Sequence, residues 1–309
     1  MALLDRAIVR VLPAVPKPVV RKLSDRYIAG SELADASRVV RRLNESGKMA
    51  TIDVLGEEIT EREQALADVD AYMDVFEMIR REQLDSNVSV KLTGLGLKLD
   101  HTFCRENLAR IVRCAAERDN FVRIDMEDSS TTSETLALYR ELREEGLDNV
   151  GVVLQAYLHR TLDDIRALAE LKPNVRICKG IYVEPPEVAH QGFETVRFNF
   201  ARAIGELLDA GAYVAVATHD DWVISEALAL IEEHELTPDQ YEFQMLLGVK
   251  PELGNELIRE GHRLRIYVPF GRQWYEYSLR RLQENPKIAG YIAADTVKRL
   301  LPGRNSRRR

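Results

Sequence analysis

The runs SVKLTGLG at 89–96 and FVRIDMED at 121–128 decide the fold, because apolar and polar side chains alternate in both. Successive side chains of a strand point to opposite faces. In the first run this alternation puts Lys91 opposite the aliphatic residues, and in the second run it puts Asp125 and Glu127 there. A strand with one apolar and one charged face of this kind is typical of a barrel wall whose charged residues turn into the barrel mouth.

Six further β-rich runs share this character, at 50–57, 150–157, 175–182, 213–220, 241–248 and 264–271. Stretches with apolar residues at helical spacing separate the eight runs, at 61–84, 104–118, 133–145, 161–171, 195–210, 221–234 and 251–261. Eight such βα units without a break in composition predict an α/β protein of the (β/α)8, or TIM-barrel, type. A doubly wound open sheet is the alternative, but no GxGxxG motif follows any of the runs.

The chain around the barrel is expected to divide into three parts. Residues 1–48 form an N-terminal helical arm, in which a helix over 31–46 begins at Ser31 as N-cap and ends at Gly47. Residues 49–301 form the barrel domain, and 302–309 form a basic tail.

Composition excludes several classes of protein. The chain has 309 residues, 45% of them hydrophobic, and a formal net charge of −7, which argues against a nucleic-acid partner. No segment reaches the roughly 18 consecutive apolar residues of a membrane span, and charged residues interrupt the N-terminal apolar stretch. Three cysteines without a CxxC pair fit reduced thiols. A cytoplasmic location is therefore expected.

Polar residues gather at the ends of the predicted strands, where barrel enzymes carry their reactive groups. They are Lys91, Asp125, Glu127, Gln155, Lys179, His219, Asp220 and Gln244. Some have simpler explanations, since Asp125 could neutralise Arg123 or Lys91, and Gln155 could bond its neighbours as readily as a heteroaromatic ring.

Two further points concern the strand ends. Arg176 and Lys179 are three residues apart, so in a continuous strand their side chains point to opposite faces. Both reach one ligand only if the strand bulges or ends between them. His219 and Asp220 are poor candidates for metal ligands, because the six histidines form no HxH or HExxH spacing. No metal site is expected.

A helical stripe follows the last strand, in GRQWYEYSLRRLQENP at 271–286. Tyr277, Arg280, Arg281 and Glu284 recur at i, i+3, i+4 and i+7 and so share one face of a C-terminal helix at the barrel mouth. A solvated, salt-bridged face would show the same spacing. The position favours bidentate capture of a carboxylate by the paired arginines.

These motifs, in this order, resemble the proline dehydrogenase family over nearly all of residues 49–290. The family signature YxxRRxxE stands at 277–284, and SVKL, RIDMED, LQAY, RICKGIY, ATHD, EFQML and YVPFG match the family's strand ends in sequence. One small departure is Ile181, where the KGAY run of the family usually has alanine.

The resemblance implies a distorted (β/α)8 barrel that binds FAD and oxidises L-proline to Δ1-pyrroline-5-carboxylate, the first step of proline degradation. A hydride would pass from proline C5 to flavin N5, and the electrons would go to a membrane quinone. The implied partners are L-proline, the quinone, a membrane surface and a pyrroline-5-carboxylate dehydrogenase. The implied location is cytoplasmic, with peripheral and transient association with the membrane.

The resemblance also implies roles for individual residues. In the catalytic centre, Asp125 would position Lys91 and Arg176 would lie near flavin N5. The substrate would be held by Lys91, Arg280 and Arg281 at its carboxylate, with Glu284 orienting the arginines, and by Tyr182, Tyr267 and Tyr277 around its ring. The FAD contacts would be Met126, Gln155, Lys179, Gly180, Ile181, Thr218, His219 and Gln244.

Two other functions fit a barrel with these residues. A class I aldolase-type lyase could form a Schiff base at Lys91 or Lys179. A non-catalytic binding protein is the other, although burying so many inward charges without a ligand is costly.

Overall fold

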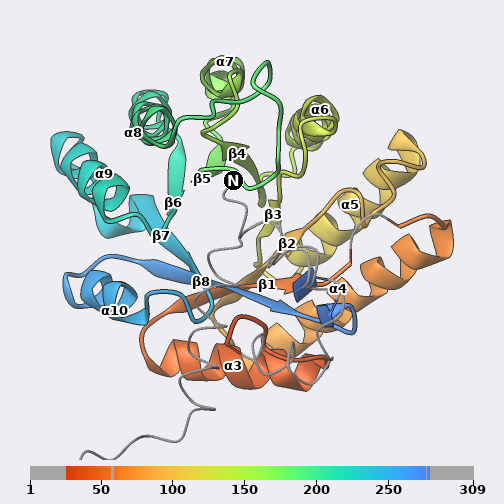
Figure 1. Cartoon of the computed structure of the whole chain (residues 1–309). Helices are drawn as coiled ribbons and strands as arrows, with labels where there is room; N and C mark the ends of the chain where they lie inside the picture. Colours follow the sequence, from red (N-terminus) through yellow and green to blue (C-terminus); the bar gives the residue numbers. More distant parts are fainter. Residues whose placement is uncertain (1–25, 57–58, 276, 279–309) are drawn as a thin grey trace, which may run out of the picture.

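Eight parallel strands close into a barrel in the computed structural model, which describes residues 26–56, 59–275 and 277–278 (Figure 1). The strands are β1 Met49–Val54, β2 Ser86–Val90, β3 Val122–Ile124, β4 Val150–Gln155, β5 Asn174–Cys178, β6 Tyr213–Ala217, β7 Tyr241–Leu246 and β8 Leu264–Phe270. Each strand pairs with the next in chain order, and β8 closes onto β1. The predicted barrel is confirmed, and the alternative of an open doubly wound sheet is wrong.

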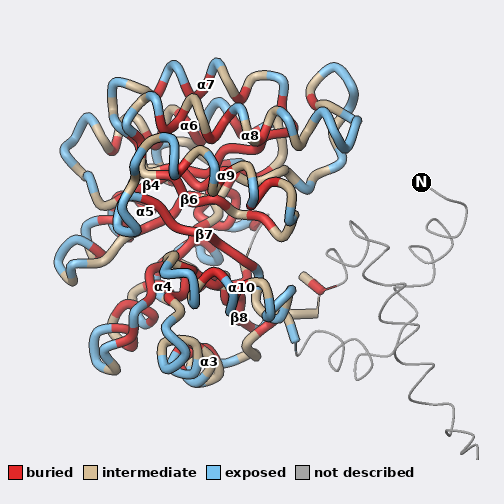
Figure 2. Tube along the Cα trace, turned by 90° about the vertical axis from the view of Figure 1, so that its left-hand side faces the viewer, coloured by how far each residue is buried: buried red, intermediate tan, exposed pale blue. Residues whose placement is uncertain are grey.

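Most residues of the barrel strands are buried, and Figure 2 shows them in red. Val88 pairs with Val122, and Val90 with Ile124, and none of the four is exposed. Their β-branched side chains suit a pleated surface covered by helices. This outer layer of contacts fixes which residues of the same strands point inward.

Eight α-helices surround the barrel in the described part of the chain. They are α3 Leu33–Glu45, α4 Arg62–Glu82, α5 His101–Ala116, α6 Thr132–Glu144, α7 Thr161–Leu168, α8 Phe193–Asp209, α9 Asp221–Glu233 and α10 Pro251–Arg259, with 3-10 turns η2 Ala169–Leu171 and η3 Pro238–Gln240. The seven helical stretches expected between strands correspond to α4 through α10.

Helix α3 precedes the barrel and packs on its wall against β1 and β8 (Figure 1). Ala36 and Val40 of α3 are buried in the main apolar core. Ser31 was the wrong N-cap, because Glu32 caps the helix: its carboxylate and that of Asp35 form a reciprocal capping box. Gly47 ends the helix as expected, with φ +75°.

Strands β2 and β5 end before the lysines of their predicted runs. β2 stops at Val90 because the chain turns at once, with the Leu95 and Leu97 amides donating to the Leu92 carbonyl at 3.0 and 2.9 Å. β5 likewise ends at Cys178, so Lys179 has left the ladder. Of the two possibilities for Arg176 and Lys179, the structure therefore shows a strand that ends between them and not a bulge.

Candidate active site at the barrel mouth

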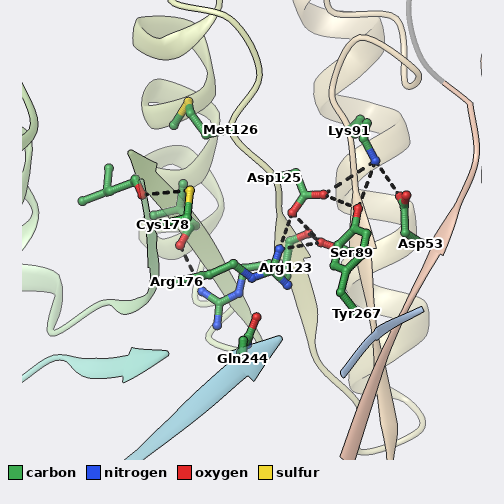
Figure 3. Close-up of polar contacts among 12 residues, drawn as sticks. Asp53, Ser89, Lys91, Arg123, Asp125, Met126, Arg176, Cys178, Gln244 and Tyr267 are labelled. Atoms are coloured by element: carbon green, nitrogen blue, oxygen red, sulfur yellow. Dashed lines mark hydrogen bonds and ion pairs between the residues drawn. The ribbon is translucent and has the colours of Figure 1, made fainter. Parts of the chain in front are cut away.

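Asp125 follows β3 and lies at the centre of the inward-facing cluster (Figure 3). Its Oδ1 accepts from Arg176 Nη1 at 2.6 Å and from Ser89 Oγ at 2.6 Å, and its Oδ2 accepts from the Tyr267 hydroxyl at 2.9 Å. Burial alone raises the pKa of Asp125, but Arg176, Lys91 and the hydrogen bonds outweigh it, and the net pKa is below the ordinary value. Asp125 is therefore ionised at neutral pH and acts as an anchor.

Lys91 follows β2 and reaches a different carboxylate. Its Nζ donates to Asp53 Oδ1 at 2.7 Å and to the Tyr267 hydroxyl at 3.2 Å, whereas Asp125 Oδ2 is 3.7 Å away. Asp53 thus holds Lys91 more directly than Asp125 does, and Asp125 acts on it through the Tyr267 hydroxyl. Burial raises the pKa of Asp53 to about 6, against the opposing charge of Lys91.

Asp53 was not among the predicted site residues. It lies on β1 and has no exposed surface. The alternation that identified Lys91 was present here too, since Thr51 and Asp53 alternate with Ala50, Ile52 and Val54. Applying it to the first run would have found this residue.

Arg176 on β5 keeps hydrogen-bonding capacity that no described residue uses. Its Nη1 binds Asp125, but its Nε and Nη2 are buried and have no partner within the described chain. On the neighbouring strand β4, Gln155 donates through Nε2 to the Met126 and Glu127 carbonyls at 3.3 and 3.2 Å, and its Oε1 is also buried without a partner there.

These buried atoms have no partner among the described residues and lie on adjacent strands, which indicates a planar ligand. Leaving a buried donor or acceptor unpaired costs about 1 to 3 kcal/mol. A heteroaromatic ring with both acceptors and donors on its edge would satisfy the two nitrogens of Arg176 and the amide oxygen of Gln155. The residues present therefore fit a flavin.

An open groove of about 420 Å³ continues from the ends of β5 and β6. It is lined by Lys179, Arg197, Thr218, His219, Asp220, Asp221 and Lys250. Asp220 accepts from Lys179 and from Arg197 Nε at 2.8 Å. Burial raises the pKa of Asp220, but Arg197 and Lys179 outweigh it and hold this pKa far below the usual range. Arg197 and Lys250 are additions to the predicted site; both lie outside the strand ends on which the prediction was based.

His219 is neutral in this groove. Its Nε2 accepts from the Leu246 amide at 3.0 Å, and burial, together with Lys250, lowers its pKa to about 4. With the ring nitrogen and the Asp220 carboxylate both engaged by protein donors, neither side chain is arranged as a metal ligand.

Gly180 and Ile181 follow β5 on the loop that carries Tyr182. Gly180 has φ +100°, and a Cβ there would lie 2.2 Å from the Tyr157 ring, so only glycine fits. Ile181 is 42% exposed and Tyr182 is half-buried. This close approach to Tyr157 sets the path of the loop.

The remaining predicted residues lie in different surroundings. Thr218 and Gln244 are buried near the ends of β6 and β7, and Gln244 donates to Glu242 at 2.5 Å. Met126 belongs to the main apolar core. Tyr277 lies in a helical turn after β8, its amide donating to the Gln273 carbonyl at 3.1 Å.

Arg280, Arg281 and Glu284 lie outside the described residues. The proposed carboxylate clamp and most of the predicted C-terminal helix therefore stay predictions.

A barrel with convergent charged groups at the carboxyl ends of its strands is typical of barrel enzymes. A sequence model of the family described as "Proline dehydrogenase" matches residues 36–294. The chain is 40% identical over 274 residues to "Proline dehydrogenase 1" of Bacillus subtilis (strain 168), covering 89% of this chain and 90% of that protein. It is 35% identical over 280 residues to "Proline dehydrogenase" of Deinococcus radiodurans, with 89% and 90% covered.

A solved structure agrees in fold. Proline utilization A (PutA) from Bdellovibrio bacteriovorus, inactivated by N-propargylglycine, has a TM-score of 0.82 at 21% identity, covering 93% of this chain but 38% of that chain. The chain belongs to the proline dehydrogenase family, a family of oxidoreductases. The resemblance seen in the sequence is confirmed.

Proposed function

We propose that the protein oxidises L-proline to Δ1-pyrroline-5-carboxylate with FAD bound across the barrel mouth. The Arg176 nitrogens and Gln155 oxygen that have no partner among the described residues carry this proposal, because they lie beside the cluster of Lys91, Asp125 and Tyr267. FAD supplies the acceptor for the hydride that leaves proline C5 for flavin N5. The protein contributes position and charge.

The chain's own residues hold the substrate and its cofactor in this proposal. Lys91, with Arg280 and Arg281, binds the proline carboxylate, Glu284 orients the arginines, and Tyr182, Tyr267 and Tyr277 wall the ring. A hydride leaves the carbon next to nitrogen only when the amine is neutral, and nearby cations lower the pKa of the bound ammonium. Asp125 keeps Arg176 and the Tyr267 hydroxyl in place.

The cofactor contacts follow the surfaces described above. Arg176 and Gln155 would hold the polar edge of a bound flavin. Lys179 and Arg197, which share Asp220, and Lys250, which pairs with Asp221, would hold the diphosphate in the groove. The other contacts we propose are Met126, Gly180, Ile181, Thr218, His219 and Gln244.

The Schiff-base lyase is disfavoured by ion pairing. Lys91 pairs with Asp53 at 2.7 Å, and Lys179 pairs with Asp220. A nearby carboxylate stabilises the ammonium form, whereas a Schiff base needs a neutral amine. Borohydride should therefore trap no covalent adduct with carbonyl substrates.

Flavin reduction tests the proposed function. The purified protein should carry a flavin spectrum that bleaches on anaerobic addition of L-proline, and Arg176→Met should slow bleaching by about ten-fold or more. A colourless protein that takes up no FAD would exclude the proposal.

Arg280→Met and Arg281→Met should each weaken proline binding by about ten-fold with flavin retained.

We further propose that a membrane quinone is the final electron acceptor, reached during transient contact of a cytoplasmic protein with the bilayer. Within the described residues, no helix combines the length and hydrophobicity that a membrane crossing requires. Deleting 303–309, which lies outside the described chain, should weaken salt-sensitive liposome binding if the tail makes this contact. The product would pass to a pyrroline-5-carboxylate dehydrogenase.

A further inference from the structure

The loop 179–192, called the Tyr182 loop here, joins β5 to α8 and is tied at both ends to the chain after β4. Near its start, the Tyr157 amide donates to the Lys179 carbonyl at 2.9 Å. Near its end, the His190 amide donates to the Tyr157 carbonyl at 2.8 Å, and the His159 amide donates to the Val188 carbonyl at 3.0 Å. The segment that carries Tyr182 lies between these two anchors.

The middle of this loop gains little from apolar burial. Ile181 is 42% exposed and Val183 is 85% exposed. A different contact lies one residue further on, where the Glu184 carboxylate accepts from both the backbone amide and the hydroxyl of Ser129, each at 2.7 Å. Ser129 lies on the loop after β3, close in sequence to Asp125.

The Ser129 side of this contact is itself well ordered by local hydrogen bonds. The Thr131 amide donates to the Asp128 carbonyl at 3.1 Å, and the Ser130 amide donates to Asp128 Oδ1 at 2.9 Å. Two charge-assisted hydrogen bonds accepted by one carboxylate fix both the distance and the orientation of the two loops. The Glu184–Ser129 bridge therefore joins the loop after β3 to the loop after β5, on either side of β4.

We propose that Glu184 is a positioning residue for the substrate pocket, which through Ser129 holds Tyr182 in the place where it contacts the substrate ring. The inference rests on the proposed function, in which Tyr182 walls the proline ring. It adds a residue that touches neither substrate nor flavin.

The bridge predicts a particular kinetic effect. Without it, the loop would occupy the binding-competent arrangement only part of the time, and the apparent affinity for proline falls by that fraction. Once proline is bound, the arrangement is occupied and hydride transfer proceeds as before. Loss of the bridge therefore raises KM and leaves kcat nearly unchanged.

Glu184→Ala and Glu184→Gln test this, with Glu187→Ala as the matched control. Glu187 is an exposed carboxylate of the same loop with no hydrogen bond to other described residues. Glu184→Ala should raise KM for L-proline by about ten-fold, with kcat within about two-fold of wild type. Glu184→Gln keeps an acceptor for the Ser129 amide and should recover most of the affinity, and Glu187→Ala should match wild type.

Two further measurements separate positioning from general destabilisation. Amide hydrogen exchange over 181–183 should be faster in Glu184→Ala than in Glu187→Ala, with or without flavin, at an unchanged melting temperature. In a Tyr182→Ala background, adding Glu184→Ala should raise KM no further, because the bridge acts through Tyr182.

The outcomes distinguish this inference from the proposed function. If wild type reduces its flavin with proline but Glu184→Ala has the KM of Glu187→Ala, the positioning role is wrong and the proposed function stands. A fall in kcat at constant KM, or no recovery in Glu184→Gln, also overturns the role. A wild-type protein without proline-dependent flavin reduction overturns the proposed function itself.

Discussion

Asp68 on α4 is a partly buried carboxyl next to the turns that follow β1 and β2. A Cβ on Gly56 would lie 2.4 Å from Asp68 Oδ2, and one on Gly94 would lie 3.3 Å from the same atom. Burial raises the pKa of Asp68 to about 7, and Asp53 adds to the rise while Lys91 opposes it. The folded protein therefore binds this proton more tightly than the unfolded chain does.

Replacing Asp68 should change how stability depends on pH. Because the folded pKa is raised from 3.8 to about 7, the free energy of unfolding falls as pH rises through this window. Asp68→Asn should remove that fall and be more stable than wild type by about 1 to 3 kcal/mol at about pH 8, with no difference at about pH 4. Urea unfolding at both pH values measures this, and Asp74→Asn, an exposed carboxyl of the same helix, is the control.

Lys91 and Asp53 form a buried ion pair, and removing Lys91 alone should lower the free energy of unfolding. Lys91→Met leaves Asp53 buried without its cation and should lower the free energy of unfolding by about 2 to 4 kcal/mol at about pH 8. The loss should shrink as pH falls from 8 toward 6, because Lys91 lowers the pKa of Asp53 and without it Asp53 binds a proton above the wild-type pKa of about 6. Lys91→Met/Asp53→Asn should recover most of the stability; equal losses in the single and double variants would show that the pair is not the cause.

At the scale of elements, the path after β5 depends on one glycine. Gly180 and Gly211 both have positive φ, +100° and +69°, but only Gly180 has a close neighbour, the Tyr157 ring, whereas a Cβ on Gly211 would meet nothing within 4 Å. A side chain at Gly211 would therefore cause backbone strain only, whereas one at Gly180 would cause backbone strain and a clash with Tyr157.

Gly180→Ala should be the more damaging of two matched substitutions. Gly211→Ala should lower the free energy of unfolding by about 1 kcal/mol through backbone strain alone. Gly180→Ala should cost about 1 to 3 kcal/mol more, because Tyr157 or the loop must move. It should also weaken flavin retention, measured by the flavin absorbance left after gel filtration. Equal stability of the two variants would contradict the close contact.

At the scale of the whole molecule, the barrel closes between β7, β8 and β1 around a buried ion pair. Arg265 Nε donates to Glu242 at 2.9 and 3.1 Å, and Arg265 Nη1 donates to the Ala50 carbonyl at 2.7 Å. Burial raises the pKa of Glu242, but Arg265 outweighs it and the net pKa is lowered. The contact thus joins β1, the first strand, to β7 and β8, the last two strands.

Glu242→Gln should test this closure. Leaving the Arg265 guanidinium buried without its counter-charge should lower the free energy of unfolding by about 3 kcal/mol. Glu77→Gln removes an exposed partner of Arg80 on α4 and should leave stability unchanged. Thermal and urea unfolding compare the two, and similar melting temperatures would mean that the buried pair contributes nothing to closure.

The sequence alone determined the barrel, the order of its elements and the meeting of Lys91 and Asp125 at the mouth, whereas Arg176 and Tyr267 were assigned to the site through the family resemblance. The reason is local: strand alternation and helical spacing are properties of neighbouring residues, and in a closed barrel every inward side chain at a strand end reaches the same mouth. The family motifs then assigned chemistry to those positions.

Only the tertiary structure decided which charges pair. Asp53 rather than Asp125 holds Lys91, Arg197 shares Asp220 with Lys179, and Glu184 bridges to Ser129. Each of these contacts joins residues from different βα units, so no local spacing encodes it. The atoms of Arg176 and Gln155 that lack a partner among the described residues likewise emerge only from the packed mouth, because a missing partner depends on all of the surrounding groups.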